Sequence, residues 1–298
     1  MQEGVVMAAF GQKYVDLAYQ AAKSLLQHNP GLEVDLFTDA ERNQGPFSRI
    51  HVLDAVWIRS KVDAMLQSRF DKTLFLDVDL YVLADLGDVF EVLDKFDIAA
   101  THDQFRNSIH ARRVYRKRME NAFPQINSGV FGFRQSEKVT NFLQEWKQEI
   151  KIQGIGKDQP SLRELFWNKD LRLSVLPAEY NLWDLSLIDQ MKPALHTAPR
   201  ILHSDIFRDF PEPPSGSDVL IHYLGKARAH KLGLLLAADE TLAQRTGRPA
   251  LLPTRKQRNT SRQLYALART SRFRRTVIKV LKEVLLPVGA RHENTPKS

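Results

Sequence analysis

Two aspartates, Asp77 and Asp79, interrupt an apolar run at residues 72–83, Lys-Thr-Leu-Phe-Leu-Asp-Val-Asp-Leu-Tyr-Val-Leu. The run predicts a buried strand, and burying a carboxylate costs several kcal/mol unless a charged partner meets it. Side chains two apart on a strand share a face, so the two carboxylates can bind one cation together. Hard oxygen ligands suit Mg²⁺ or Mn²⁺ on a diphosphate. The alternative is a strand end at a solvated edge, where both acids are hydrated.

The elements that must position these acids alternate along the chain. A strand, a helix and a second strand in the first 38 residues predict a βαβ unit, and the alternation continues after it. We therefore predict an α/β fold with a mostly parallel central sheet flanked by helices, which binds ligands at the carboxyl ends of its strands. The predicted strands are 5–10, 34–38, 72–83, 98–101, 129–133 and 219–223, and the predicted helices are 14–26, 61–69, 88–95, 136–150 and 158–166.

Composition and charge narrow the class of protein. The 298 residues are 43% hydrophobic and 26% charged, as in a globular protein, and the absence of cysteine excludes disulfides and zinc-thiolate or iron-sulfur sites. Residues 253–298 carry 12 Lys/Arg against 2 Asp/Glu, which leaves residues 1–252 at a net charge of −2. This asymmetry predicts a near-neutral catalytic or binding domain with a basic appendage and no nucleic-acid partner. Beyond about residue 236 the pattern loses strands and becomes helical and basic, so we predict the domain at 1–235 and a basic helical C-terminal extension at 236–298.

The sequence predicts no membrane-spanning segment. The N-terminus lacks a signal-peptide pattern, and no run reaches the roughly 18 apolar residues of a transmembrane helix. Residues 270–286 predict an amphipathic basic helix, which either packs on the domain or a partner chain or lies on an anionic membrane surface. We therefore expect a cytoplasmic protein, with peripheral membrane contact through this helix as the alternative to packing.

Four further motifs follow the aspartates in a fixed order. They are Ile-Asn-Ser-Gly-Val-Phe-Gly-Phe at 126–133, Lys-Asp-Gln-Pro-Ser-Leu at 157–162, Leu-Pro-Ala-Glu-Tyr-Asn-Leu at 176–182 and Ile-His-Tyr-Leu-Gly at 221–225. Together with the Asp-X-Asp motif, they resemble the retaining glycosyltransferases of the glycogenin and bacterial galactosyltransferase type, glycosyltransferase family 8. The resemblance covers roughly residues 4–230 and implies the Rossmann-like nucleotide-diphospho-sugar transferase fold called GT-A.

The resemblance implies a metal site and a donor site. Asp77, Asp79 and His222 would hold Mn²⁺ or Mg²⁺ on the diphosphate of a UDP-sugar, which suits two carboxylates and a neutral imidazole. His222 at the end of a strand could otherwise be an ordinary packed histidine. The residues that would bind the donor are Ala8, Ala9, Phe10, Tyr14, Lys61, Val78, Asn127, Ser128, Gly129, Gly225 and Lys226. For Tyr14, packing in the first helical turn is an equally good interpretation.

Asp158 and Gln159 match the family's Asp-Gln pair beside the anomeric carbon, although Asp158 could also be a helix N-cap. The family continues its histidine motif as His-X-X-Gly-X-X-Lys-Pro-Trp, whereas this chain has no Pro-Trp after His222. Arg228 falls at the position of the lysine and would bind the β-phosphate, with Lys226 as a substitute. Asp158, Gln159 and Arg228 are thus the predicted catalytic residues.

The function implied by the resemblance is hexosyl transfer from a UDP-sugar to a hydroxyl of a glycan or lipid-linked glycan, with retention. Six Arg/Lys at 105–118, where the family builds its acceptor side, are either a solvated face or a site for an acidic or phosphorylated glycan. One alternative function is a sugar-nucleotide pyrophosphorylase, although residues 10–14 supply no glycine- and arginine-rich phosphate loop. The other alternative function is non-catalytic: a module that binds nucleotide sugars or polyanions.

Overall fold

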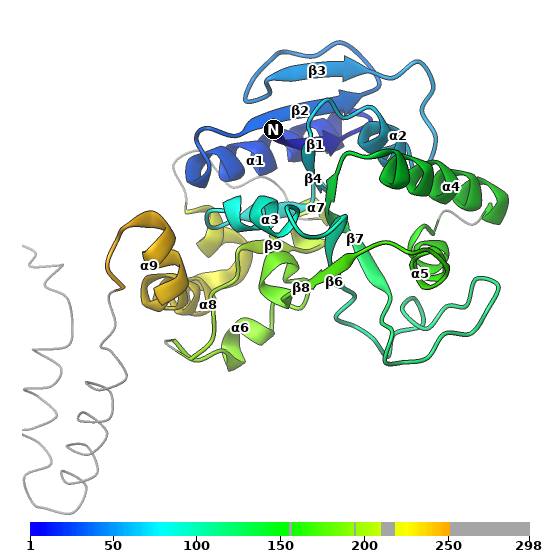
Figure 1. Cartoon of the computed structure of the whole chain (residues 1–298). Helices are drawn as coiled ribbons and strands as arrows, with labels where there is room; N and C mark the ends of the chain where they lie inside the picture. Colours follow the sequence, from blue (N-terminus) through cyan, green and yellow to red (C-terminus); the bar gives the residue numbers. More distant parts are fainter. Residues whose placement is uncertain (155–156, 194, 210–217, 251–298) are drawn as a thin grey trace, which may run out of the picture. The chain divides into compact units, whose positions relative to one another are not determined.

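The computed structural model describes residues 1–154, 157–193, 195–209 and 218–250. Within them, a seven-stranded sheet forms the centre of the fold (Figure 1). Its spatial order is β3 (Arg49–Val52), β2 (Glu33–Thr38), β1 (Glu3–Ala8), β4 (Lys72–Leu76), β7 (Ile126–Arg134), β6 (Ile98–His102) and β8 (Leu173–Leu176). Strands β1 to β4 are parallel, β8 is parallel to β6, and β7 is antiparallel to β4 and β6. The predicted mostly parallel sheet is confirmed.

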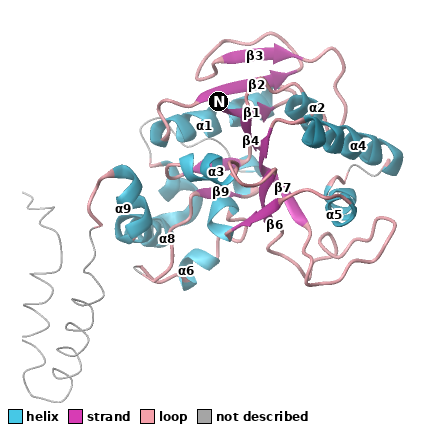
Figure 2. Cartoon of the chain, in the orientation of Figure 1, coloured by secondary structure: helices cyan, strands magenta, loops and turns pink. Residues whose placement is uncertain are grey.

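Helices cover both faces of this sheet (Figure 2). Alternation along β1 sends Val5 and Met7 into one apolar cluster and Val6 into the other. The first cluster includes residues of α1 and α3, and the second includes residues of α2, α4 and α5. Their bounds are Gln12–His28 for α1, Lys61–Leu66 for α2, Gly87–Val92 for α3, Glu137–Gln153 for α4 and Gln159–Asn168 for α5. The helices expected from hydrophobic periodicity over residues 1–168 are therefore present.

The prediction of one continuous strand at 72–83 is wrong. β4 ends at Leu76, and the chain leaves the large sheet through Asp77 and Asp79 before β5 (Leu80–Val82) begins. β5 pairs antiparallel with β9 (Ile201–His203) in a separate two-stranded sheet. The register places Leu80 opposite His203, so this small sheet brings the end of β9 to the two aspartates.

The strand predicted at 219–223 is also wrong, because these residues begin helix α8 (Val219–Ala238). Asp218 caps the helix: its side chain accepts a hydrogen bond of 2.9 Å from the Ile221 amide. Gly225 interrupts the helical backbone with a φ of +75°, a conformation that glycine adopts readily. The apolar side chains of α8 pack in a third cluster with Leu202 and Phe207 rather than in a sheet.

The predicted domain boundary at 235/236 falls inside α8. The chain divides after Ala250, so α8 and the following helix α9 (Glu240–Thr246) belong to the same unit as the sheet. The prediction of an amphipathic basic helix at 270–286 lies outside the described residues. Among the helices that the structure does describe, none is both long and apolar enough to cross a bilayer.

A buried ion pair holds α9 against the segment that leads into β9. Asp239 accepts hydrogen bonds of 2.7 Å from both the Arg200 guanidinium and the Ala198 amide. Burial alone would raise the pKa of Asp239, but the hydrogen bonds from Arg200, Thr241 and Ala198 lower it to about 2. Since Arg200 directly precedes β9, the pair helps to position His203.

We expect Asp239→Ala to lower the free energy of unfolding by about 3–5 kcal/mol, because Arg200 stays buried without its carboxylate. Because the folded pKa of Asp239 is depressed, its stabilisation is present above about pH 4 and is lost as the pH falls towards 2. Urea unfolding at several pH values measures both effects. Glu91→Ala, which removes an exposed partner of Arg245, is the control and should cost less than about 1 kcal/mol. Equal losses in the two variants would contradict the assignment.

Candidate functional site

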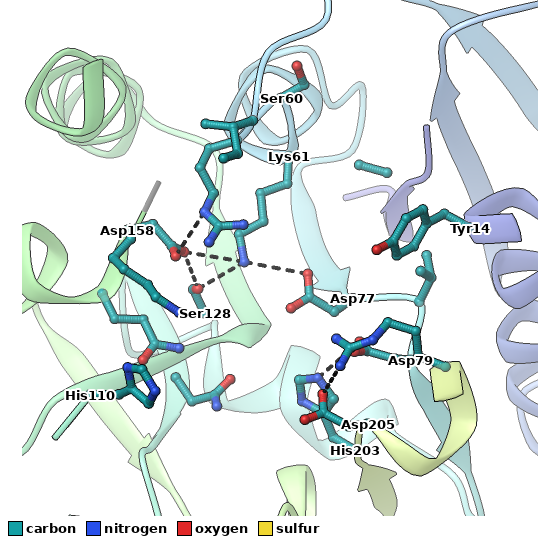
Figure 3. A pocket seen from close by; sticks show the side chains of 18 of the residues that line it. Tyr14, Ser60, Lys61, Asp77, Asp79, His110, Ser128, Asp158, His203 and Asp205 are labelled. Atoms are coloured by element: carbon teal, nitrogen blue, oxygen red, sulfur yellow. Dashed lines mark hydrogen bonds and ion pairs between the residues drawn. The ribbon is translucent and has the colours of Figure 1, made fainter. Parts of the chain in front are cut away.

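A cavity of about 1010 Å³ opens where β1, β4 and β7 meet the first turns of α2 and α5 (Figure 3). Its position at the carboxyl ends of β1 and β4 agrees with the expected location of the ligand site. The structure gathers most of the predicted site residues on its wall: Ala8, Phe10, Tyr14, Lys61, Asp77, Val78, Asp79, Asn127, Ser128, Asp158 and Gln159. Residues from five separate segments of the chain thus converge on one cavity.

One end of the cavity carries two carboxylates and an imidazole. Ligand atoms of Asp77, Asp79 and His203 all lie within 4.8 Å of one another. His203 Nδ1 is 2.8 Å from the Asn181 side-chain oxygen, and this contact orients the ring so that Nε2 lies 3.2 Å from Asp79. Two carboxylates and an imidazole whose other nitrogen is hydrogen-bonded to Asn181 can hold a divalent cation.

Electrostatics distinguishes the two aspartates. Burial raises the pKa of Asp77, and the neighbouring Asp79 charge adds to this, while Lys61 and His203 oppose it. Burial would also raise the pKa of Asp79, but the hydrogen bond and charge of His203 hold it below its usual value. Two close carboxylates in a buried setting are costly without a cation, which is what a metal would supply.

A second polar cluster lies towards the opposite side of the cavity, around Asp158 at the start of α5 (Figure 3). Asp158 accepts a hydrogen bond of 2.5 Å from Ser128, and its carboxylate lies 3.3 Å from Lys61 Nζ and 3.2 Å from Arg59 Nε. Lys61 Nζ also donates to Ser128 at 2.9 Å and lies 3.5 Å from Asp77. Lys61 therefore bridges the two acidic ends of the site.

Lys61 and Asp158 are both charged at neutral pH. Burial alone would lower the pKa of Lys61, but the charges of Asp158 and Asp77 outweigh it and raise that pKa. Burial would raise the pKa of Asp158, but the charges of Lys61 and Arg59 lower it. Asp158 is therefore a carboxylate already held by two cations, which makes it a weak proton acceptor.

The third part of the wall is apolar and aromatic. Ala8 and Phe10 come from the end of β1, and Tyr14, 44% exposed, extends from the first turn of α1. This exposure disagrees with ordinary core packing of Tyr14 and leaves a ring face open to a planar ligand. Ala9 does not line the cavity, because its side chain is buried and its amide donates to the Phe37 carbonyl at 2.9 Å.

Gly129 lies behind Asp77, Asp79 and His203, the candidate metal-ligand group, rather than on the cavity wall. A Cβ atom on Gly129 would collide with the ring of His203 and would come within 2.8 Å of an Asp77 oxygen. The requirement for glycine is therefore close packing against these two side chains. The neighbouring Asn127 accepts a hydrogen bond of 2.9 Å from the Gly129 amide, which holds the Asn127 side chain against the backbone of β7.

The predicted histidine motif at 222–228 is not part of this site. His222 lies in α8 with its ring against Tyr223, outside the group formed by Asp77, Asp79 and His203. Gly225 and Lys226 also lie in α8 and do not line the cavity. Arg228 pairs with Asp189 of α6 (Leu187–Gln190) at 2.6 Å, away from the cavity wall. The expectation failed because the segment is helical and packs elsewhere.

The structure adds four side chains that sequence reasoning missed. His203 ends β9, Arg208 lies in α7 (Ile206–Asp209), Trp183 packs edge-on against His203, and Arg59 precedes α2. All four line the cavity, and Arg208 Nη1 is 3.5 Å from Asp79. The sequence held one possible signal for His203. In the run Ile201-Leu202-His203, two apolar residues typical of a short strand are followed by a histidine, a residue type that can bind a metal.

Comparison with known protein families gives one match over most of the chain. A family model described as nucleotide-diphospho-sugar transferase matches residues 17–212. No curated protein matches the sequence. The matched region includes His203 and Arg208 and ends before His222.

Solved glycosyltransferase structures share the fold. The apo form of the glycosyltransferase GlyE of Streptococcus pneumoniae TIGR4 is similar with a TM-score of 0.53 and 21% identity; the match covers 79% of this chain and 60% of GlyE. The galactosyltransferase LgtC in complex with donor and acceptor sugar analogs is similar with a TM-score of 0.50 and 16% identity, over 77% of this chain and 94% of LgtC. The fold predicted as GT-A is therefore confirmed.

Proposed function

This chain belongs to the nucleotide-diphospho-sugar transferase family and is a glycosyltransferase, and from this premise we propose that it uses a UDP-sugar donor with a divalent metal. The acceptor in this proposal is a hydroxyl of a glycan or of a lipid-linked glycan, and transfer retains the anomeric configuration. The observation that carries the proposal is one cavity with a ligand set for a cation at one end and the buried Lys61–Asp158 pair towards the other. Its volume of about 1010 Å³ suits an extended substrate.

Asp77, Asp79 and His203 would hold the cation, with Mn²⁺ or Mg²⁺ as the candidates. The donor set fits, because it combines two carboxylates with an imidazole that Asn181 orients, and the group leaves its remaining positions to substrate oxygens. When bound, the metal would supply positive charge to the diphosphate as UDP departs.

Arg208 takes the role that the sequence assigned to Arg228. Its guanidinium lines the cavity beside Asp79 and also contacts Asp205 at 2.7 Å, so it lies next to the position proposed for the diphosphate. A guanidinium can bind two phosphate oxygens at once and stays charged as the leaving group develops its negative charge.

The rest of the wall divides between the nucleoside and the transferred sugar. In this proposal, Ala8, Phe10 and Tyr14 contact the uridine, with the exposed Tyr14 ring against the base. The transferred sugar lies between Gln159 on one side and the cluster of Lys61 and Asp158 on the other. Ser128 and Asn127 also line this part of the cavity. Asp158 is then fixed for hydrogen bonding to sugar hydroxyls.

In the proposed reaction the bond between the anomeric carbon and the β-phosphate oxygen breaks, and the acceptor oxygen forms a bond on the same face. The proton of the acceptor hydroxyl passes to an oxygen of the departing phosphate. The lowered pKa of Asp158 supports this route, because a carboxylate held by Lys61 and Arg59 is a poor general base.

The test is incubation of the full chain with Mn²⁺ and a panel of α-linked UDP-sugars, followed by NMR of the first product before mutarotation. We expect an α-configured product, either a glycoside or the free sugar released to water. A β-configured first product would contradict retention and would call for a separate carboxylate base.

The same incubation separates the alternatives. With added pyrophosphate, a pyrophosphorylase would release UTP and a sugar 1-phosphate, whereas we expect UDP as the nucleotide product. A non-catalytic binding module would leave the donor intact under all conditions. Contact of residues 270–286 with a membrane that carries a lipid-linked acceptor stays a prediction from the sequence.

A further inference from the structure

A second, smaller cavity of about 120 Å³ adjoins the large one behind Asp158 and Gln159. We call it the annex. Five residues line both spaces: Arg59, His110, Lys157, Asp158 and Gln159. The annex alone adds Arg113, Gln125 and Pro160 to its wall. Its volume is enough for several waters, and hence for a substituent such as a carboxylate or a phosphate.

The wall of the annex carries more positive than negative charge. Arg59, Arg113 and Lys157 contribute three cations, against the single carboxylate of Asp158. That carboxylate is already held by Arg59 and by Lys61 from the large cavity. Within the described part of the chain, Arg113 and Lys157 have no carboxylate within ion-pair distance. An unbalanced cationic pocket attracts an anion.

Nearby acids do not neutralise this charge, because they hold the surrounding segment in place. Glu149 accepts hydrogen bonds from Tyr115 and from the Arg116 guanidinium, the latter at 2.7 Å. Glu164 accepts from the amides of Arg116 and Lys117 at 3.0 Å. Neither glutamate lines the annex. These contacts hold residues 115–117, and the Arg113 amide donates to the His110 carbonyl at 3.2 Å, so the backbone that carries the exposed Arg113 side chain is held next to the annex.

The annex and the metal-ligand group lie on different sides of the large cavity. Figure 3 shows His110 and Asp158 on one side and Asp79 and His203 on the other, with the Lys61 amine between them. The donor diphosphate belongs at the Asp79 side under the proposed function. An anion in the annex is therefore a second anionic group, carried by the sugar at the reaction centre.

We propose that the annex binds a phosphate or carboxylate substituent on a sugar substrate, which makes anionic sugars the preferred substrate class. This inference rests on the proposed function, because it takes the large cavity as the site of sugar transfer. Arg113 can bind two oxygens of such a group, and Lys157 adds a point charge. Gln125 lines the same wall, and its side-chain amide donates a hydrogen bond of 2.9 Å to the Gln159 side-chain oxygen, which fixes Gln159 between the two cavities.

Calorimetry on the full chain with Mn²⁺ and UDP tests this with matched probes. Glucose, galactose and mannose 6-phosphates are titrated against their parent sugars, and UDP-glucuronate is titrated against UDP-glucose without UDP present. We expect at least one anionic probe to bind about tenfold more tightly than its neutral partner, as for a charge-assisted pair of hydrogen bonds. Tighter sugar phosphates identify the acceptor as the source of the anion, and tighter UDP-glucuronate identifies the donor.

Arg113→Ala should remove most of that tenfold preference, and Arg113→Lys should keep part of it. The control is Lys117→Ala with Arg118→Ala, two cations from the same segment that do not line the annex, and it should keep the preference. UDP binding in Mn²⁺ is measured on every variant and reports separately on the donor site. If the wild-type protein does not bind UDP in the presence of Mn²⁺, the proposed function is overturned. Intact UDP binding with no preference for any anionic probe, or a preference that Arg113→Ala leaves unchanged, would overturn the annex.

Discussion

Asp79→Asn is expected to lower sugar transfer by at least about a hundredfold, because it removes a charged ligand from the cation site while keeping the shape of the side chain. The same loss is expected when EDTA removes the metal from the wild-type protein. Mn²⁺ affinity in the presence of UDP, measured by electron paramagnetic resonance, provides a readout that does not depend on turnover. In the variant, this affinity should fall together with the rate.

Two histidine variants make the assignment specific. His203→Asn should weaken Mn²⁺ binding and transfer to a similar degree, because His203 is the imidazole beside Asp77 and Asp79. His222→Ala should leave both quantities within about threefold of wild type, since His222 lies in α8 outside that group. Wild-type activity in Asp79→Asn, or a larger loss in His222→Ala than in His203→Asn, would contradict the site as the structure presents it.

Arg208→Ala is expected to reduce transfer by about a hundredfold, the size of effect typical for removing one preorganised group that stabilises developing negative charge. Arg208→Lys should recover part of this loss, because it restores the charge without the two-point geometry. Initial rates over a range of donor concentrations separate the effects on kcat from those on KM. A loss confined to KM would mean that Arg208 binds the donor without stabilising the departing UDP.

Arg228→Ala is the matched control for this prediction. Arg228 forms an ion pair with Asp189 at the surface, and such pairs contribute about 0–1 kcal/mol to stability. We therefore expect near wild-type transfer and a small change in unfolding. If Arg228→Ala lost activity while Arg208→Ala kept it, the diphosphate would have to lie near α8, and the proposed orientation of the donor would be wrong.

Local patterns in the sequence predicted five of the seven strands of the large sheet, whereas the edge strands β3 and β8 were not predicted. The alternation of strands and helices, the Asp-Val-Asp interruption and the ordered motifs around Asn127 and Asp158 are short-range features, and they identified the fold class and 11 of the 25 residues that line the cavity. These signals are reliable because hydrophobic periodicity and turn chemistry act within a few residues. Lys61 was predicted through the family resemblance, and the structure places it at the start of α2.

The choice of His203 as the proposed third ligand and of Arg208 as the arginine proposed for the diphosphate depended on tertiary structure. His203 reaches Asp79 across 124 residues of sequence, through a three-residue strand that is too short to show a period. His222 had the better local motif, but its apolar neighbours are equally compatible with a strand and a helix, and the Asp218 cap and the third core cluster favour the helix. Pairing of β5 with β9, rather than any local pattern, decides which histidine and which arginine face the aspartates, because strand pairing is a long-range interaction.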